Sequence, residues 1–173
     1  MQDNLDILNE KIRSTCCSFK TPHRVLLGYG SHSSYIMFIG EAPAVRGIEE
    51  GICPFSRRSW PVFLKVLDRF NITPEQAYTT NLVKCSIPNI LVGNARSCIK
   101  YLVEEVKLLD PKIIVVLSSS TSGILQESQS WLDEVATRKI IYFRHPMSAI
   151  YNNRVHQYIQ ELTHLLIEAK IIS

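Results

Sequence analysis

The run at residues 112–117, KIIVVL, constrains the fold more than any other segment of the chain. Its residues are apolar and β-branched without alternation, which predicts a strand of a parallel sheet that is covered on both faces. The segment before it, residues 96–109, has helical character and ends at Asp110-Pro111, where proline disfavours a continued helix. We therefore expect a helix followed by a buried strand.

Similar alternation continues along the chain. Three further segments have the composition of strands, at residues 35–39, about 77–83 and 138–143. Helices are predicted where apolar residues recur at helical spacing, at Leu5, Leu8 and Ile12, at residues 60–70, after the serine-rich turn, and from about Asn153. Strands that alternate with helices predict an α/β fold, a three-layer α/β/α sandwich with a central four-stranded parallel sheet.

Length and composition indicate an ordinary globular chain. The 173 residues suit a single domain at residues 1–173, with 46% hydrophobic and 20% charged residues. The formal charge of +3 permits a polyanionic partner without requiring one. No apolar run approaches the length of a membrane span, and the first residues do not have the pattern of a signal peptide. We expect a cytoplasmic protein.

Polar residues follow all of the predicted strands. Glu41, Asn81, Ser118 and His145 stand where the four strands end. Ligands of open parallel sheets bind beyond the carboxyl ends of the strands. Each residue alone would be read as a cap or a turn residue, but together they favour a functional site.

The five cysteines are not distributed like a disulfide framework. Cys16 and Cys17 are adjacent, and Cys85 and Cys98 bracket a loop. In a reducing compartment, clustered cysteines indicate a metal site or catalysis. A small buried hydrophobe is the alternative for any of them, and we prefer it for Cys53.

Four motifs resemble the uracil-DNA glycosylase superfamily. They are GEAPAVRGIEEGICPF at residues 40–55, TNLVKC at 80–85, the Cys98 helix followed by DPKIIVVL, and HPMS at 145–148. They occur in the family's order, and the resemblance covers most of the chain, from about Cys16 to Asn153. The closest resemblance is to the iron–sulfur families four and five: GEAP is similar to family four, and the continuation to Pro54 and Phe55 is more similar to family five.

The resemblance implies a monofunctional DNA glycosylase, which flips a uracil or another modified base out of DNA and cleaves its N-glycosidic bond. The abasic product belongs to base excision repair. By the same resemblance Glu41 lies near the sugar and His145 donates to the leaving base. Asn81 recognises the base edge, Ala42 lines the base site, and Phe55 either stacks on the base or belongs to the core.

Contacts with DNA are also implied. Residues 147–151 correspond to the wedge that enters the duplex, with Met147, Ser148 and Ile150 as its candidate contacts. The basic residues expected to contact phosphates are Arg57, Arg58, Lys84, Arg96 and Lys100.

The cofactor implied is a [4Fe–4S] cluster with Cys16, Cys17, Cys85 and Cys98 as ligands. The family's first ligand position holds Ser14 here, so that Cys16 would have to substitute for it. Zinc or no metal are the alternatives.

Two departures from the family leave the substrate open. Arg57 stands at a position that is small in the family, and the turn SSST at residues 118–121 replaces a Leu-Gly-Ala turn. An altered pocket favours, as one alternative, a glycosylase that acts on hydroxymethylated or glucosylated cytosine of phage DNA in antiviral defence. A catalytically inactive DNA-binding module is another. In each case we expect DNA as the partner, no membrane, and a monomer.

Overall fold

The computed structural model describes residues 2–15, 25–43, 55–56, 58–85 and 92–170. Its centre is a five-stranded sheet with the order β1-β3-β2-β4-β5. The strands are β1 (Tyr29–Gly30), β2 (Ile36–Gly40), β3 (Tyr78–Asn81), β4 (Ile113–Leu117) and β5 (Lys139–Phe143). Because β3, β2, β4 and β5 are all parallel, the prediction of a central parallel sheet is confirmed.

The predicted count of strands was one too low. Strand β1 pairs antiparallel with β3 at the sheet edge through Tyr29 and Gly30 alone. A strand of two residues has no periodicity that could be recognised in the sequence. The edge strand therefore depends on its neighbour rather than on its own composition.

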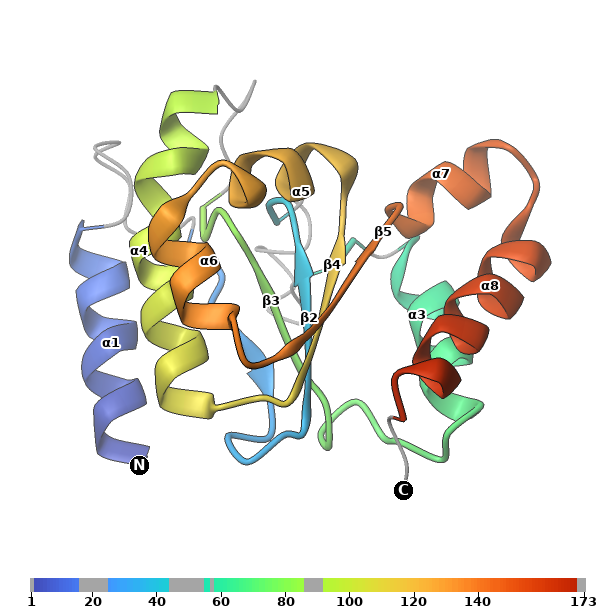
Figure 1. Ribbon diagram of the computed structural model, residues 1–173, viewed down its shortest axis with the longest axis horizontal. Coiled ribbons are helices and arrows are strands. Elements are labelled where there is room, and N and C mark those ends of the chain that lie inside the picture. Colours follow the sequence, from blue (N-terminus) through green and yellow to red (C-terminus); the bar gives the residue numbers. More distant parts are fainter. Residues whose placement is uncertain (1, 16–24, 44–54, 57, 86–91, 171–173) are drawn as a thin grey trace.

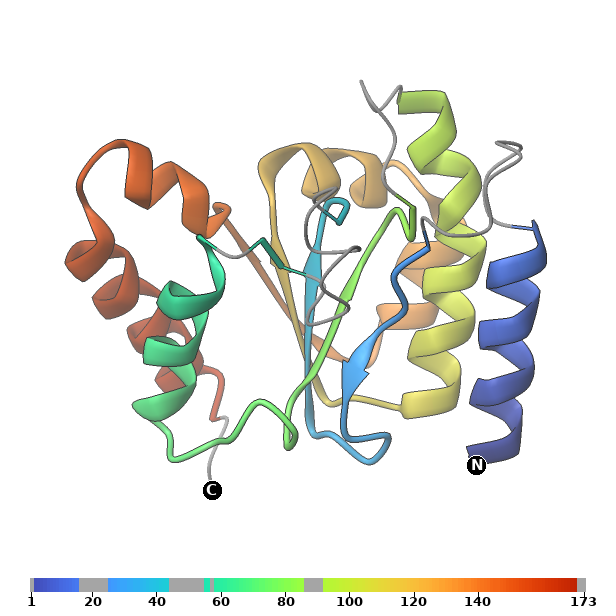
Figure 2. The same cartoon turned by 180° about the vertical axis from the view of Figure 1, so that it is seen from behind.

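Helices cover both faces of the sheet (Figures 1 and 2). One face carries α1 (Gln2–Thr15), α4 (Val92–Leu109), α5 (Ser119–Gln126) and α6 (Gln129–Val135). The other carries α3 (Trp60–Asp68), α7 (Pro146–Tyr151) and α8 (Val155–Glu168). This is the expected three-layer arrangement. No helix in the described part of the chain is both long enough and apolar enough to cross a membrane.

The two core layers share the central strands. In β2, Met37 and Ile39 pack on the side of α1 and α4, whereas Phe38 packs on the side of α3 and α8. Successive side chains of a strand point to opposite faces, so that a strand buried on both sides must be apolar throughout. The continuous apolar composition of β4 has this same cause, since all of its residues are buried.

The helices differ from the sequence expectation near the serine-rich turn and near the C-terminus. The single helical stretch expected after the turn is two helices, because the Ser128 side chain accepts a hydrogen bond from the Trp131 N–H and starts α6. Helix α7 occupies residues that were expected to form a wedge segment, and α8 begins at Val155. The strands β2 to β5 end at one edge, where the polar residues at the strand ends meet.

Candidate active site

Gly40 is the point at which two predicted site residues meet. It ends β2 and pairs in register with Asn81, the last residue of β3. A Cβ atom at Gly40 would lie 2.3 Å from Asn81 Oδ1 and 2.9 Å from Phe55 Cε1. The amide of Asn81 and the ring of Phe55 therefore both lie against this glycine, and no larger residue would leave them in place.

Glu41 follows Gly40 and is held from the neighbouring strand. Its Oε2 accepts hydrogen bonds from Ser118 Oγ at 2.9 Å and from Ser120 Oγ at 2.6 Å. Ser118 is also the N-cap of α5, since its side chain accepts from the Thr121 N–H. The carboxylate thus lies at the N-terminus of a helix, where the helix dipole favours negative charge.

His145 follows β5 and is the N-cap of α7. Its Nδ1 accepts a hydrogen bond from the Met147 N–H at 3.1 Å, so that in the neutral ring the proton is on Nε2. Burial lowers the pKa of His145, and the charge of Glu41 acts in the opposite direction. The net effect favours a neutral imidazole with an Nε2–H donor. Glu41 lies near enough to His145 for its charge to act on the imidazole, and a shared catalytic role of the two residues stays a prediction.

Helix α8 supports the segment before His145. The Tyr158 hydroxyl donates to the Arg144 carbonyl oxygen at 3.1 Å. The Arg144 guanidinium lies over the rings of Phe143 and Tyr158 and pairs with Glu161. The backbone that carries the imidazole is therefore fixed from the helical layer behind it.

Phe55 packs in the core and also lies against Gly40 in the site. Its side chain is only 4% exposed, and its ring meets Phe63 edge to face at a centroid distance of 5.1 Å. This is the packing of a core aromatic residue, although the ring also lies against Gly40 beside Asn81. Stacking on a base therefore stays a prediction. Ala42 is half-buried and packs against the core on the α4 side, and its contact with a base is likewise untested.

The expected wedge residues belong to a short helix. Met147, Ser148 and Ile150 are half-buried in α7. The sulfur of Met147 lies 3.8 Å from the Ser56 hydroxyl, which joins α7 to the segment that carries Phe55. The adjacent Tyr151 is 74% exposed. Insertion into DNA stays a prediction for this segment.

The prediction that Lys84 contacts a DNA phosphate is wrong. Lys84 is fully buried and forms an ion pair with Glu105 of α4. Its ammonium group also donates to Thr80 Oγ1 at 2.6 Å and to the Asn81 carbonyl oxygen at 2.8 Å. The Tyr78 hydroxyl donates to Glu105 as well, and burial together with that carboxylate raises the pKa of Tyr78. Lys84 thus supports the backbone of Asn81 from within.

The other predicted phosphate contacts lie on the surface or outside the described residues. Arg58 is exposed, whereas Arg57 lies outside the part of the chain that is described. Arg96 pairs with Glu127, and the Lys100 ammonium lies 4.9 Å from the Tyr101 ring centroid. These placements leave phosphate contacts as predictions.

The predicted cluster ligands are described only in part. Cys85 and Cys98 are buried in one core cluster, and Cys16 and Cys17 lie outside the described residues. Cys85 is disulfide-bonded, and it would need to be reduced before it could bind a metal. Among the described residues alone, no three metal-binding side chains come together.

The residues that flank the segment 16–24 lie near both of the described cysteines. Thr15 Oγ1 is 2.7 Å from the Tyr101 hydroxyl, one helical turn beyond Cys98 on α4. At the other end, Val25 forms an isolated bridge with Cys85. The chain therefore enters this segment close to Cys98 and leaves it beside Cys85, an arrangement that fits a shared set of cysteine ligands.

Ser120 is the site residue that the sequence did not reveal. It was part of a serine-rich turn, but nothing distinguished it from Ser119, which is exposed and has no hydrogen bond to Glu41 among the described contacts. The available signal was the position of the turn at the end of a strand.

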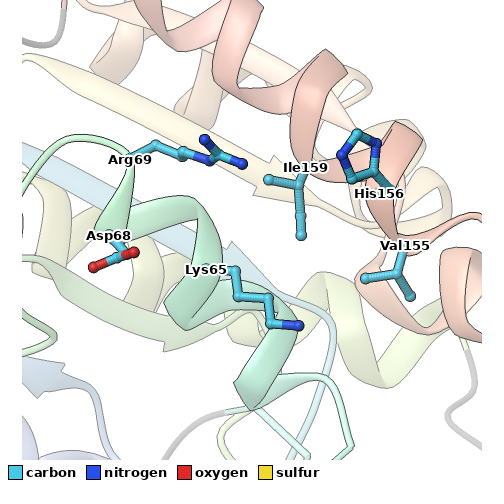
Figure 3. Close-up of a pocket in the computed structure, with 6 residues that line it drawn as sticks. All are labelled: Lys65, Asp68, Arg69, Val155, His156 and Ile159. Carbon is cyan, nitrogen blue, oxygen red and sulfur yellow. The ribbon is translucent and has the colours of Figure 1, made fainter.

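A separate cavity lies between α3 and α8 and contains none of the predicted site residues (Figure 3). Its volume is about 690 Å³. The residues that line it are Lys65, Asp68, Arg69, Val155, His156 and Ile159. The cavity is therefore distinct from the site at the strand ends.

Comparison with known proteins yields one family and several relatives. The model of the Uracil DNA glycosylase superfamily matches residues 27–166. The type-4 uracil-DNA glycosylase of Saccharolobus solfataricus is 27% identical over 92% of this chain and 83% of its own. The proteins of the same name from Archaeoglobus fulgidus and Thermotoga maritima are 26% and 24% identical, over 90% of this chain and 87% and 88% of theirs.

Proposed function

Because the chain belongs to the uracil-DNA glycosylase superfamily, we propose that it is a monofunctional DNA glycosylase that excises uracil from DNA. The name of the relatives indicates uracil as the base. The position of Glu41, Asn81 and His145 at one edge of the sheet supports cleavage of an N-glycosidic bond. A base inside a duplex is inaccessible, so the nucleotide must be flipped into this site. The product is an abasic site, the first intermediate of base excision repair.

Asn81 and Phe55 bind the flipped base. One amide offers a donor and an acceptor side by side, which match O4 and N3–H of uracil. The contact of both side chains with Gly40 holds the amide beside the aromatic ring. The buried ammonium of Lys84 keeps the Asn81 backbone in position, because it donates to the Asn81 carbonyl oxygen.

His145 stabilises the leaving base. When the N-glycosidic bond breaks, its electron pair passes to the base, which becomes an anion. The His145 Nε2–H donates to the carbonyl oxygen of the base that lies next to the glycosidic nitrogen. This hydrogen bond strengthens as the negative charge on the base develops. The Met147 N–H on Nδ1 fixes the tautomer that the role requires.

Glu41 acts on the sugar side. The deoxyribose acquires positive charge at its anomeric carbon as the base departs, and a carboxylate nearby stabilises that charge. The same carboxylate orients a water molecule, whose oxygen bonds to the anomeric carbon while one of its protons passes to Glu41. The base anion takes up a proton from solvent, and Glu41 returns its proton to solvent. The expected result of both effects is an abasic sugar and a free base.

We infer that Cys16, Cys17, Cys85 and Cys98 hold a structural [4Fe–4S] cluster. When bound, such a cluster supplies a cross-link between distant segments, here between the end of α1, the loop after β3 and α4. Purification without oxygen should give a brown protein with about four iron atoms per chain. Zinc in metal analysis, or a colourless protein without metal, would contradict the assignment.

The proposal extends to the whole chain. Residues 1–173 act as one domain and a monomer in the cytoplasm, with DNA as the partner. Size-exclusion chromatography with and without an oligonucleotide tests the monomer directly.

The experiment is a strand-cleavage assay. Duplexes that contain uracil, thymine, hypoxanthine, xanthine, hydroxymethylcytosine or glucosylated cytosine are incubated with the protein, and abasic sites are then cleaved with alkali. We expect cleavage at uracil and none at thymine. His145→Ala should lower the single-turnover rate about 10²–10³-fold, whereas His156→Ala, a change at an exposed histidine outside the site, should not. Cleavage at the modified cytosines alone would favour antiviral defence, and no cleavage at all would favour a DNA-binding module.

A further inference from the structure

The two serine hydroxyls at the Glu41 carboxylate converge on one of its oxygens. Ser118 Oγ lies 2.9 Å and Ser120 Oγ 2.6 Å from Oε2. The two hydroxyl oxygens are themselves 2.9 Å apart. The contacts thus form a triangle of three oxygens, in which two hydroxyl protons are available.

The distribution of these protons follows from charge. A hydrogen bond to an ionised carboxylate is about twice as strong as one between neutral hydroxyls. Both protons therefore point to Oε2, and the contact between Ser118 and Ser120 carries none. Since one carboxylate oxygen has about two lone-pair sites, Oε2 is fully occupied. Oε1 takes no part in the triangle.

The triangle is attached to a rigid part of the fold. Ser118 is 3% exposed and follows β4 directly. Its Oγ accepts from the Thr121 N–H, and its carbonyl oxygen accepts from the Ser122 hydroxyl at 2.7 Å. Ser120 lies in the first turn of α5. The hydroxyls are therefore held by a strand end and a helix start.

We propose that Ser118 and Ser120 are positioning residues, which fix the Glu41 carboxylate through Oε2 and leave Oε1 directed to the water and the deoxyribose. The inference rests on the proposed function. A glutamate side chain has several rotatable bonds, and its freedom is lost when it is fixed. With the carboxylate already oriented, that loss does not add to the barrier of the reaction.

Ser120 carries the test, because Ser118 also caps α5. Ser120→Ala is compared with Ser119→Ala, which removes the neighbouring hydroxyl without a contact to Glu41. We expect kcat on a uracil-containing duplex to fall about tenfold in Ser120→Ala, with KM within about twofold of the wild type. Ser119→Ala should match the wild type, and Ser120→Thr, which keeps a hydroxyl, should restore most of the rate.

A second measurement separates this inference from the proposed function. Crystal structures of the free wild type, Ser120→Ala and Ser119→Ala are compared at the Glu41 side chain. In the wild type and in Ser119→Ala the carboxylate should occupy one conformer with Oε2 at the serine hydroxyls, whereas in Ser120→Ala it should turn away or occupy several conformers, whether or not the protein cleaves uracil. The same Glu41 conformer and equal kcat in the two variants would overturn the positioning role. An inactive wild type with Glu41 displaced only in Ser120→Ala would overturn the substrate alone.

Discussion

The buried ion pair between Lys84 and Glu105 makes a prediction about stability that can be worked from the structure. Both side chains are completely removed from solvent. The change Lys84→Met removes the ammonium. Among the described residues, the carboxylate of Glu105 then keeps hydrogen bonds only from the Tyr78 and Thr80 hydroxyls. The change also removes the donor of the Asn81 carbonyl oxygen.

The cost follows from desolvation. Removal of one partner of a buried pair costs about 3–5 kcal/mol, because the remaining charge has no compensation. For a chain of this size, each kcal/mol lowers the melting temperature by about 2–4 °C, so we expect a decrease of roughly 6–20 °C. The double variant Lys84→Met/Glu105→Leu leaves no buried charge, and it should recover most of the lost free energy.

Equilibrium unfolding in urea measures these free energies. The matched control is Lys112→Met, which breaks an exposed pair with Asp110 and should change the free energy of unfolding by less than about 1 kcal/mol. A loss in Lys84→Met as small as that of the control would refute the account. So would a double variant that is no more stable than Lys84→Met.

Further predictions concern Gly40, His145 and Tyr158. Gly40→Ala places a Cβ 2.3 Å from Asn81 Oδ1, so kcat/KM for uracil excision should fall at least about 100-fold. The free energy of unfolding should decrease by only about 1–3 kcal/mol. Unchanged kcat/KM would mean that the amide does not bind the base. Because burial lowers the pKa of His145 below its ordinary value of 6.5, the unfolded chain takes up its proton first as pH falls through 6.5. Stability should therefore decrease between 6.5 and the lowered pKa, and His145→Gln should flatten that part of a stability–pH curve. Protonation of Nδ1 would break its bond to the Met147 N–H, so activity should persist below pH 6.5 and then fall; loss already above that value would contradict the burial argument. Tyr158→Phe removes the hydrogen bond to the Arg144 carbonyl oxygen, next to His145. The free energy of unfolding, measured in urea, should decrease by about 0.5–1.5 kcal/mol. No measurable change would show that the bond does not support this segment.

The parts of the fold that could be predicted depend on local patterns. Residues 113–117 are buried on both faces, and their continuous apolar composition records that directly. Strand β1 could not be predicted, because its two residues pair with β3 and have no pattern of their own. Helix α7 was missed since its six residues are too few for apolar periodicity to be seen.

The site shows the same division between local and distant causes. Glu41, Asn81 and His145 could be recognised because each stands at the end of a strand or within two residues after it, and parallel strands end at one edge. The burial of Lys84 could not, since its partner Glu105 is 21 residues away and belongs to α4. The requirement for glycine at position 40 depends on Phe55 and Asn81, whose approach becomes evident only in three dimensions.

The most direct test is a crystal structure with a duplex that contains 2′-fluoro-2′-deoxyuridine, a nucleotide whose glycosidic bond resists cleavage. We expect the uracil to lie outside the duplex, with the Asn81 amide on its O4 and N3–H edge. His145 Nε2 should lie within about 3.2 Å of O2, and Glu41 Oε1 should face the sugar. A uracil that stays stacked in the duplex, or that binds away from these three residues, would contradict the account.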